Sequence, residues 1–276
     1  NELSRFITET QDFIIRKIRQ PYKSWWFEIS GEVRRNLRKA EGARNIIRSI
    51  IRTRKNSGKK FNDLLDMLLD ARYEDTGLPM EETQVIDEIL ILLIAGHETT
   101  ANALSWTLYL LSRHANHQNQ LREETRDLSV QETVRSEWLN ALISESLRLY
   151  PPAWISDRIA LKADQYNNFG FPENTIIILF FYGLHRDPKY WENAEDFMPE
   201  RFLKLQGVRE KLKAFYPFGA GPRLCIGNNF AMAEMTIFLQ AMIRRFNILP
   251  TTCEPTKIPL VTLRPDQVIL NITQLA

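Results

Sequence analysis

The chain has 276 residues, 44% of them hydrophobic, which is enough to bury the core of one large domain or of two modest ones. Its 36 lysines and arginines nearly balance its 34 aspartates and glutamates, so the charge does not favour a nucleic-acid binder. The two cysteines, Cys225 and Cys253, argue against a disulfide framework and a zinc cluster, and a reducing compartment is expected.

The hydropathy pattern argues against a membrane span. The longest uncharged apolar run, Ile89–Gly96, is far shorter than the roughly 20 residues that cross a bilayer. Residues 1–20 mix charged and apolar positions at helical spacing, unlike a signal peptide. We therefore expect a cytoplasmic protein.

The N-terminal part is predicted to be helical. Residues 1–55 carry apolar positions at helical spacing, with interruptions at Pro21 and Gly31. The many arginines and lysines between 34 and 55 are expected to form a solvated helix face without a function. A short amphipathic helix over Asn62–Ala71 and a turn over Asp75–Pro79 follow.

One long helical pattern runs from Glu81 to about Ala115, which corresponds to about 50 Å at 1.5 Å per residue. Its apolar sequence is interrupted midway by Gly96, His97, Glu98, Thr99 and Thr100, in a segment that otherwise has the pattern of a fully buried helix. Because burial of an unpaired carboxylate is costly, Glu98 needs a specific role.

The rest of the chain combines helices with a few short strands. In order, we expect a polar loop, a helix over Glu137–Leu149, strands over Arg158–Leu161 and (well buried) Thr175–Tyr182, an irregular region over 183–217, a helix over Asn228–Phe246 and a terminal hairpin over 258–273. These elements predict a mainly α fold with small β-sheets.

A lone cysteine follows a glycine-rich loop and precedes a helix, within the segment Phe218–Gly227. Backbone N–H groups and the positive end of a helix dipole stabilise a thiolate, which is a good ligand for iron. Glycines at 221 and 227 allow a tight turn and the close approach of a flat cofactor. An isolated cysteine is more often a buried structural residue, but this spacing favours a ligand.

This segment resembles the cytochrome P450 family, because it fits the pattern Phe-x-x-Gly-x-Arg-x-Cys-x-Gly at every fixed position. The resemblance implies the cytochrome P450 fold, with haem b as the cofactor and Cys225 as the proximal ligand of the iron. It also implies that Arg223 contacts a haem propionate. The other haem contacts that it implies in this segment are Phe218, Gly219, Ile226 and Gly227.

Two further motifs of the family occur in the expected order. Glu145 and Arg148 match its Glu-x-x-Arg motif, and Pro199–Phe202 matches the segment that supplies a second arginine, Arg201. The resemblance implies a buried ion-pair network of these three charged residues, with a structural role. The i, i+3 spacing places Glu145 and Arg148 on one helix face.

Ala95–Thr100 resembles the family's oxygen-activation motif, and this resemblance explains Glu98. It implies that Glu98 and Thr99 are catalytic, with Glu98 relaying protons from solvent, and that Ala95 lies beside the haem. In the alternative interpretation, Thr99 bonds back to a backbone carbonyl and Glu98 meets a cation.

The resemblance also suggests a second propionate ligand and a substrate pocket. Arg158 follows Pro151 and Pro152 by the interval at which many members place a propionate-binding arginine. The apolar character of the pocket positions indicates a hydrophobic substrate, such as a fatty acid or a terpenoid. The positions are Ile91, Ala95, Ala153, Trp154 and Ile155.

The family's domain is longer than this chain, although the resemblance covers essentially all 276 residues. We therefore expect residues 1–276 to form one haem-binding domain that is incomplete at its N-terminus. The stretches Tyr150–Trp154 and Gly183–Pro188 resemble those of soluble bacterial members akin to fatty-acid hydroxylases.

The expected activity is that of a haem-thiolate monooxygenase, which takes electrons from NAD(P)H through a flavin or iron–sulfur protein. Lys211, Lys213 and Arg122 are expected to steer this acidic partner. One alternative is a hydroperoxide isomerase or dehydratase, against which the presence of Glu98 and Thr99 argues. Another is a non-catalytic haem protein that binds a gas.

Overall fold

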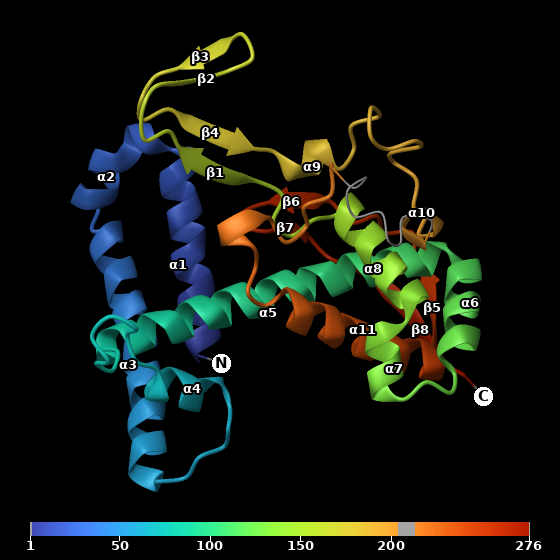
Figure 1. Ribbon diagram of the computed structural model, residues 1–276, viewed down its shortest axis with the longest axis horizontal. Coiled ribbons are helices and arrows are strands. Elements are labelled where there is room, and N and C mark those ends of the chain that lie inside the picture. The colour runs from blue at the N-terminus through green and yellow to red at the C-terminus, as the bar shows by residue number, and fades with distance from the viewer. Residues whose placement is uncertain (1, 204–212, 276) are drawn as a thin grey trace. The chain divides into compact units, whose positions relative to one another are not determined.

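The computed structural model describes residues 2–203 and 213–275 (Figure 1). The chain divides into two compact units, Asn1–His97 and Glu98–Ala276. The division falls inside the long helix α5 (Glu82–Arg113), whose bounds agree with the sequence prediction. Each unit has its own hydrophobic core.

The first unit consists mainly of helices. Helix α1 (Glu2–Arg19) packs along α3 (Glu32–Ser57), and the short helices η1 (Pro21–Lys23) and α2 (Ser24–Ile29) connect them (Figure 1). Gly31 separates α2 from α3 with a φ of 72°, a left-handed conformation that glycine adopts without strain. The predicted interruptions at proline and glycine are therefore confirmed.

Helix α4 (Leu64–Asp70) confirms the predicted short amphipathic helix. Its N-cap is Asp63, which accepts the backbone N–H of Asp66. Arg54 on α3 donates to the side-chain carboxylates of Asp63 and Asp66 and so connects α4 to α3. The core of this unit contains Ile47, Ile51, Val85 and Ile86.

The second unit is built around two long helices, α8 (Glu137–Leu149) and α11 (Asn228–Arg245), which contact each other. Both agree with the sequence prediction, α11 to within one residue. The fully buried side chains of this core include Leu139, Leu142, Leu239 and Ile243. This core supports the segment that carries Cys225, because α11 begins three residues after it.

The predicted polar loop before α8 is wrong. The segment forms helices α6 (Ala115–Thr125) and α7 (Val130–Arg135), and both contact α11. Its polar residues are used inside the fold: the buried Gln118 side chain donates to the carbonyl oxygen of Ile248 at 2.7 Å. The capping box of Ser129 and Glu132 begins α7, and this pattern is visible in the sequence.

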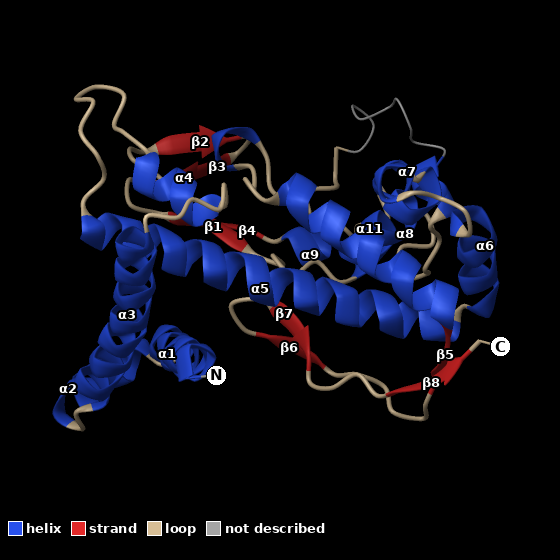
Figure 2. Ribbon diagram, turned by 90° about the horizontal axis from the view of Figure 1, so that it is seen from below, coloured by secondary structure: helices blue, strands red, loops and turns tan. Residues whose placement is uncertain are grey.

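The strands of the described residues form four antiparallel two-stranded sheets, drawn in red in Figure 2. The pairs are β1 (Ser156–Ile159) with β4 (Ile176–Leu179), β2 (Asp164–Tyr166) with β3 (Phe169–Phe171), β5 (Phe246–Pro250) with β8 (Leu270–Gln274), and β6 (Lys257–Pro259) with β7 (Leu263–Pro265). The fold is thus mainly α with small β-sheets, as predicted.

Two strand predictions need correction. The segment 175–182 is not well buried: Ile176 and Ile178 are 63% and 60% exposed, because a two-stranded ribbon leaves its apolar side chains uncovered by the described residues. Its end turns into the short helix α9 (Phe181–Leu184). The predicted terminal hairpin holds only for β6 and β7, since β8 pairs with β5 instead.

Within residues 2–203 and 213–275, none of the helices combines the length and the apolar character of a bilayer span.

Candidate functional site

The segment around Cys225 forms a tight loop before α11. Its turn is the short helix η3 (Gly221–Arg223), and the N–H of Cys225 donates to the carbonyl oxygen of Phe218 at 2.9 Å. Gly219 and Gly221 have φ values of 74° and 66°, in the left-handed region that side chains rarely adopt. The shape of the loop therefore depends on glycine at both positions.

The thiol of Cys225 is exposed, and apolar side chains flank it in the sequence. Leu224, Ile226 and Phe230 are 50%, 91% and 76% exposed. A large, flat and apolar ligand could bind to this sulfur and cover the exposed apolar side chains beside it. Phe218, Gly219 and Gly227 are half-buried in the same loop.

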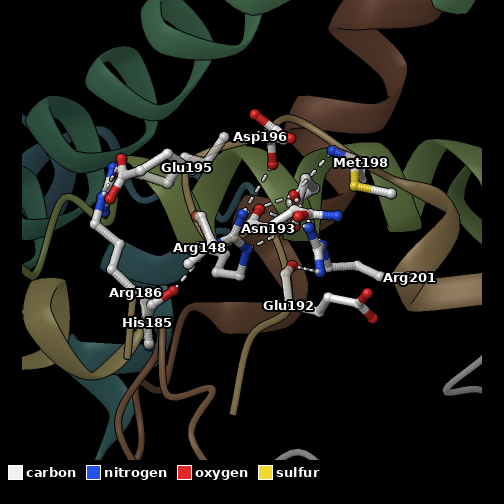
Figure 3. A network of polar contacts seen from close by, with 12 residues as sticks. Arg148, His185, Arg186, Glu192, Asn193, Glu195, Asp196, Met198 and Arg201 are labelled. Carbon is white, nitrogen blue, oxygen red and sulfur yellow. Dashed lines mark hydrogen bonds and ion pairs between the residues drawn. The ribbon is translucent and has the colours of Figure 1, made fainter. Parts of the chain in front are cut away.

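A buried ion-pair network lies on α8 and the segment that follows α9 (Figure 3). Glu145 and Arg148 are both 0% exposed. Arg148 donates from Nε and Nη2 to the two oxygens of Glu145, each at 2.8 Å. Arg201, on α10 (Glu200–Leu203), donates from Nε to Glu145 Oε1 at 3.1 Å.

The same network fixes the backbone of residues 185–198. Arg148 donates to the carbonyl oxygens of His185, Ala194 and Asp196, at 2.8, 2.6 and 3.1 Å. The N–H of Met198 donates to Glu145 Oε1 at 2.9 Å, and Figure 3 shows these groups converging. The network thus brings together the three residues that the motifs single out, and it orders the irregular segment before the cysteine loop.

Glu98 lies on α5, and a threonine from the last part of the chain contacts it. The hydroxyl of Thr262 donates to Glu98 Oε1 at 2.6 Å and accepts from Nδ2 of Asn102 at 2.9 Å. Thr262 is 5% exposed, whereas Glu98 and Thr99 are half-buried. The carboxylate therefore has a fixed hydroxyl partner on one side.

A comparison with protein families matches residues 1–272 to the family described as Cytochrome P450. The chain belongs to the cytochrome P450 family. The match agrees with the mainly helical fold, with the loop around Cys225 and with the buried network of Glu145.

Curated relatives of this P450 chain come from animals and from bacteria. Cytochrome P450 3A6 of Oryctolagus cuniculus is 32% identical over 216 residues, which are 75% of this chain and 43% of the relative. Cytochrome P450 4F11 of Homo sapiens is 36% identical over 229 residues, 77% and 42% of the two chains. Cyclooctat-9-en-7-ol 5-monooxygenase of Streptomyces melanosporofaciens is 31% identical over 213 residues, 75% and 46%. The chain thus spans less than half of each of these relatives.

The residues of this P450 chain fit a haem group. A single exposed thiol offers the soft donor that iron accepts, and the exposed Leu224, Ile226 and Phe230 offer the apolar contacts that a porphyrin needs. Arg223 on η3 and Arg158 on β1 are both exposed. They could pair with the two carboxylates of such a group.

Arg158 keeps its guanidinium close to its own strand. Its Nη1 donates to the carbonyl oxygen of Asp157 at 2.6 Å and to the hydroxyl of Ser156 at 3.2 Å. These two bonds orient the side chain and use only one of its nitrogens. The assignment to a propionate stays a prediction.

The five predicted pocket residues belong to different units. Ile91 and Ala95, on the first part of α5, are exposed, and Ile91 is 59% exposed. The expectation of a fully buried helix at this point is therefore wrong, because one side of α5 is left uncovered by the described residues. In the second unit Ala153 is exposed, and Trp154 and Ile155 are half-buried. One pocket formed by all five stays a prediction.

Sequence reasoning missed two residues that contact the candidate site residues. Thr262 is 164 residues away from Glu98, and no local pattern announces their hydrogen bond. His185 is fully buried beside Arg148, and burial followed by the charge of Arg148 lowers the pKa of its ring to about 3. In the sequence, this histidine is only one polar residue next to an aromatic stretch, and no pattern predicts its burial.

Proposed function

We propose that this chain forms the haem-thiolate part of a monooxygenase. Such an enzyme inserts one atom of O2 into an apolar organic molecule, and two electrons from NAD(P)H reduce the other atom to water. The observation that carries the proposal is the exposed thiol of Cys225 in its glycine-shaped loop at the start of α11, in a chain of the P450 family. When bound, haem supplies the activation of oxygen at its iron.

The residues of the loop would hold the cofactor. Cys225 would bind the iron through its thiolate, and the backbone N–H groups at the start of α11 would stabilise its charge. Arg223 and Arg158 would neutralise the propionates. Packing against the ring would come from Phe218, Gly219, Ile226, Gly227 and Ala95.

Glu98 and Thr99 would handle protons. Because Thr262 donates a 2.6 Å hydrogen bond to Oε1 of Glu98, the orientation of the carboxylate is fixed, and Glu98 would take up protons from solvent. Thr99 follows Glu98 directly on α5 and would pass the proton on through its hydroxyl.

The substrate would be apolar. The predicted pocket positions Ile91, Ala153, Trp154 and Ile155 carry no charge, which suits a fatty acid or a terpenoid. One bacterial relative is named as a monooxygenase of cyclooctat-9-en-7-ol, an alcohol with a large hydrocarbon part. A kinship to bacterial fatty-acid hydroxylases rests on Tyr150–Trp154 and Gly183–Pro188 and is part of this proposal.

The electron donor would be a flavin or iron–sulfur protein. Of the three cations expected to steer it, Lys213 is exposed, and Lys211 lies outside the described residues. Arg122 is not suited to this role, because its guanidinium donates to the backbone oxygens of Ile243 and Phe246 and to the side chain of Asn247. The docking proposal therefore rests on the two lysines.

The test is the absorption spectrum of the reduced protein with carbon monoxide. We expect a strongly red-shifted Soret band that is lost in Cys225→Ser, because only a thiolate ligand produces it. Cys253→Ser is the matched control, since this second free cysteine lies on no predicted site, and it should keep the band. Absence of the band in the wild-type protein, or its persistence in Cys225→Ser, contradicts the proposal.

A further inference from the structure

Among the described residues of the second unit, His185 is a fully buried histidine that lies between aromatic side chains and the charged network of Arg148. It follows α9 and is 0% exposed. Its ring lies 5.4 Å from the ring of Phe215 and 6.4 Å from that of Phe181, measured between centroids. Burial of a polar ring costs free energy unless its nitrogens form hydrogen bonds, so the hydrogen bonds of His185 indicate its role in the fold.

Nε2 of His185 accepts the backbone N–H of Tyr216 at 2.9 Å. A ring nitrogen that accepts carries no proton, so the neutral ring carries its proton on Nδ1. Among the described residues, Nδ1 has no hydrogen-bond partner. The surroundings therefore use the ring as an acceptor for one specific backbone group, and the other nitrogen is left unsatisfied.

The same residue is held from its backbone side. Its carbonyl oxygen accepts Nη1 of Arg148 at 2.8 Å, and Arg148 is itself bound to Glu145 through Nε and Nη2. Figure 3 shows His185 at the edge of this network, below Arg148. The histidine thus connects the buried ion pair on α8 to Tyr216, which lies 31 residues further along the chain.

From Tyr216 the hydrogen bonds continue to the cysteine. The carbonyl oxygen of Tyr216 accepts the N–H of Gly219 at 3.2 Å, and that of Phe218 accepts the N–H of Cys225 at 2.9 Å. The ring of His185 therefore holds the backbone at Tyr216, two residues before the loop, and the bond between Cys225 and Phe218 closes the loop itself.

We propose that His185 is a positioning residue, which fixes the start of the Cys225 loop by accepting the N–H of Tyr216 and thereby sets where the thiolate stands. This inference rests on the proposed function, in which Cys225 binds haem iron. The acceptor at Nε2, and not the bulk of the ring, performs this role.

The electrostatic surroundings keep the acceptor available. Burial and then the positive charge of Arg148 lower the pKa of the ring to about 3, and Arg186 acts in the same direction. The ring is consequently neutral at physiological pH, and Nε2 does not lose its lone pair to a proton.

Two substitutions of nearly equal shape separate the acceptor from the bulk. His185→Gln keeps an oxygen near the place of Nε2, whereas His185→Met has similar size and no comparable acceptor. Both are compared with the wild type as full-length, haem-loaded proteins. Amide hydrogen exchange reports the bond of Tyr216, and the carbon monoxide spectrum reports the share of thiolate-ligated haem.

We expect exchange of the Tyr216 amide to be about tenfold faster or more in His185→Met, as for a buried N–H that loses its acceptor, and near the wild-type rate in His185→Gln. The thiolate-ligated share should fall in His185→Met and recover in His185→Gln. Equal behaviour of the two variants in both readouts overturns the proposal, because bulk alone would then explain the residue.

A measurement on the wild type keeps the inference testable if His185→Met does not fold. In the reduced, carbon monoxide-bound protein, the nitrogen-15 shifts of His185 should show Nδ1 protonated and Nε2 unprotonated. A protonated Nε2 overturns the proposal. If the wild type lacks the thiolate spectrum, the proposed function fails, and exchange of the Tyr216 amide still decides the role of His185 in the loop.

Discussion

Substitution of Glu145 by glutamine should cost a large part of the stability of the second unit. The carboxylate is 0% exposed and accepts four hydrogen bonds, three from arginine nitrogens and one from the N–H of Met198. Glutamine keeps the shape but removes the charge, and its NH2 group would face guanidinium donors. Removal of one partner of a buried ion pair costs about 3–5 kcal/mol, because the remaining charge is left uncompensated.

Urea unfolding followed by far-ultraviolet circular dichroism measures this loss. With a slope of about 3 kcal/mol per molar urea, the midpoint should fall by roughly 1 M or more in Glu145→Gln. Glu195→Gln is the matched control, since the side chain of Glu195 is 74% exposed in its pair with Arg186. An exposed pair contributes about 0–1 kcal/mol, so this midpoint should move little. Similar midpoints for the two variants would refute the reasoning.

Three further predictions concern pH, proton delivery and backbone strain. Because the pKa of His185 is about 3 in the folded state, against about 6.5 in the unfolded state, its contribution to stability is complete above pH 6.5 and is lost as the pH falls. Between pH 7 and pH 5 the wild type should lose about 2 kcal/mol more than His185→Gln in urea unfolding, and equal losses would contradict this. In the proposed monooxygenase, Thr262→Val removes a hydrogen-bond partner of Glu98, so substrate turnover should fall roughly tenfold while the carbon monoxide spectrum stays unchanged. Full turnover would contradict this role of Thr262. Gly221→Ala places a side chain at a φ of 66° and should lower the unfolding free energy by about 1–2 kcal/mol. Gly227→Ala is the control, because the φ of −90° at this position suits any residue, and it should not lower the unfolding free energy. Equal losses in the two variants would show that backbone strain is not the cause.

The sequence predicts best what its local pattern encodes. Helix α8 has a complete apolar face and a proline shortly after its end, so its bounds follow from the pattern alone. For the loop of Cys225, the sequence pattern singles out glycines 221 and 227. Gly221 does take the left-handed conformation, but Gly219 is the other such glycine, and Gly227 has an ordinary φ of −90°. By contrast, the polar composition predicts a loop where α6 and α7 lie, although the capping box of Ser129 marks the start of α7.

Contacts between distant parts of the chain leave no such pattern. The bond of Thr262 to Glu98 and that of His185 to Tyr216 join segments that have no periodicity in common. The burial of a strand is equally nonlocal: Ile176 and Ile178 are apolar in the expected way, but nothing among the described residues packs over them. Residue type therefore predicts which groups could act, and only the fold shows which of them meet.

The pairing of β5 with β8 has a consequence for the order in which the protein is made. Strand β5 continues directly from α11, and its partner β8 is encoded 20 residues beyond its end, at Leu270–Gln274. On the ribosome, helix α11 and strand β5 are thus synthesised before strand β8, which pairs with β5. Until then β5 presents an unpaired edge, which can bind other nascent strands.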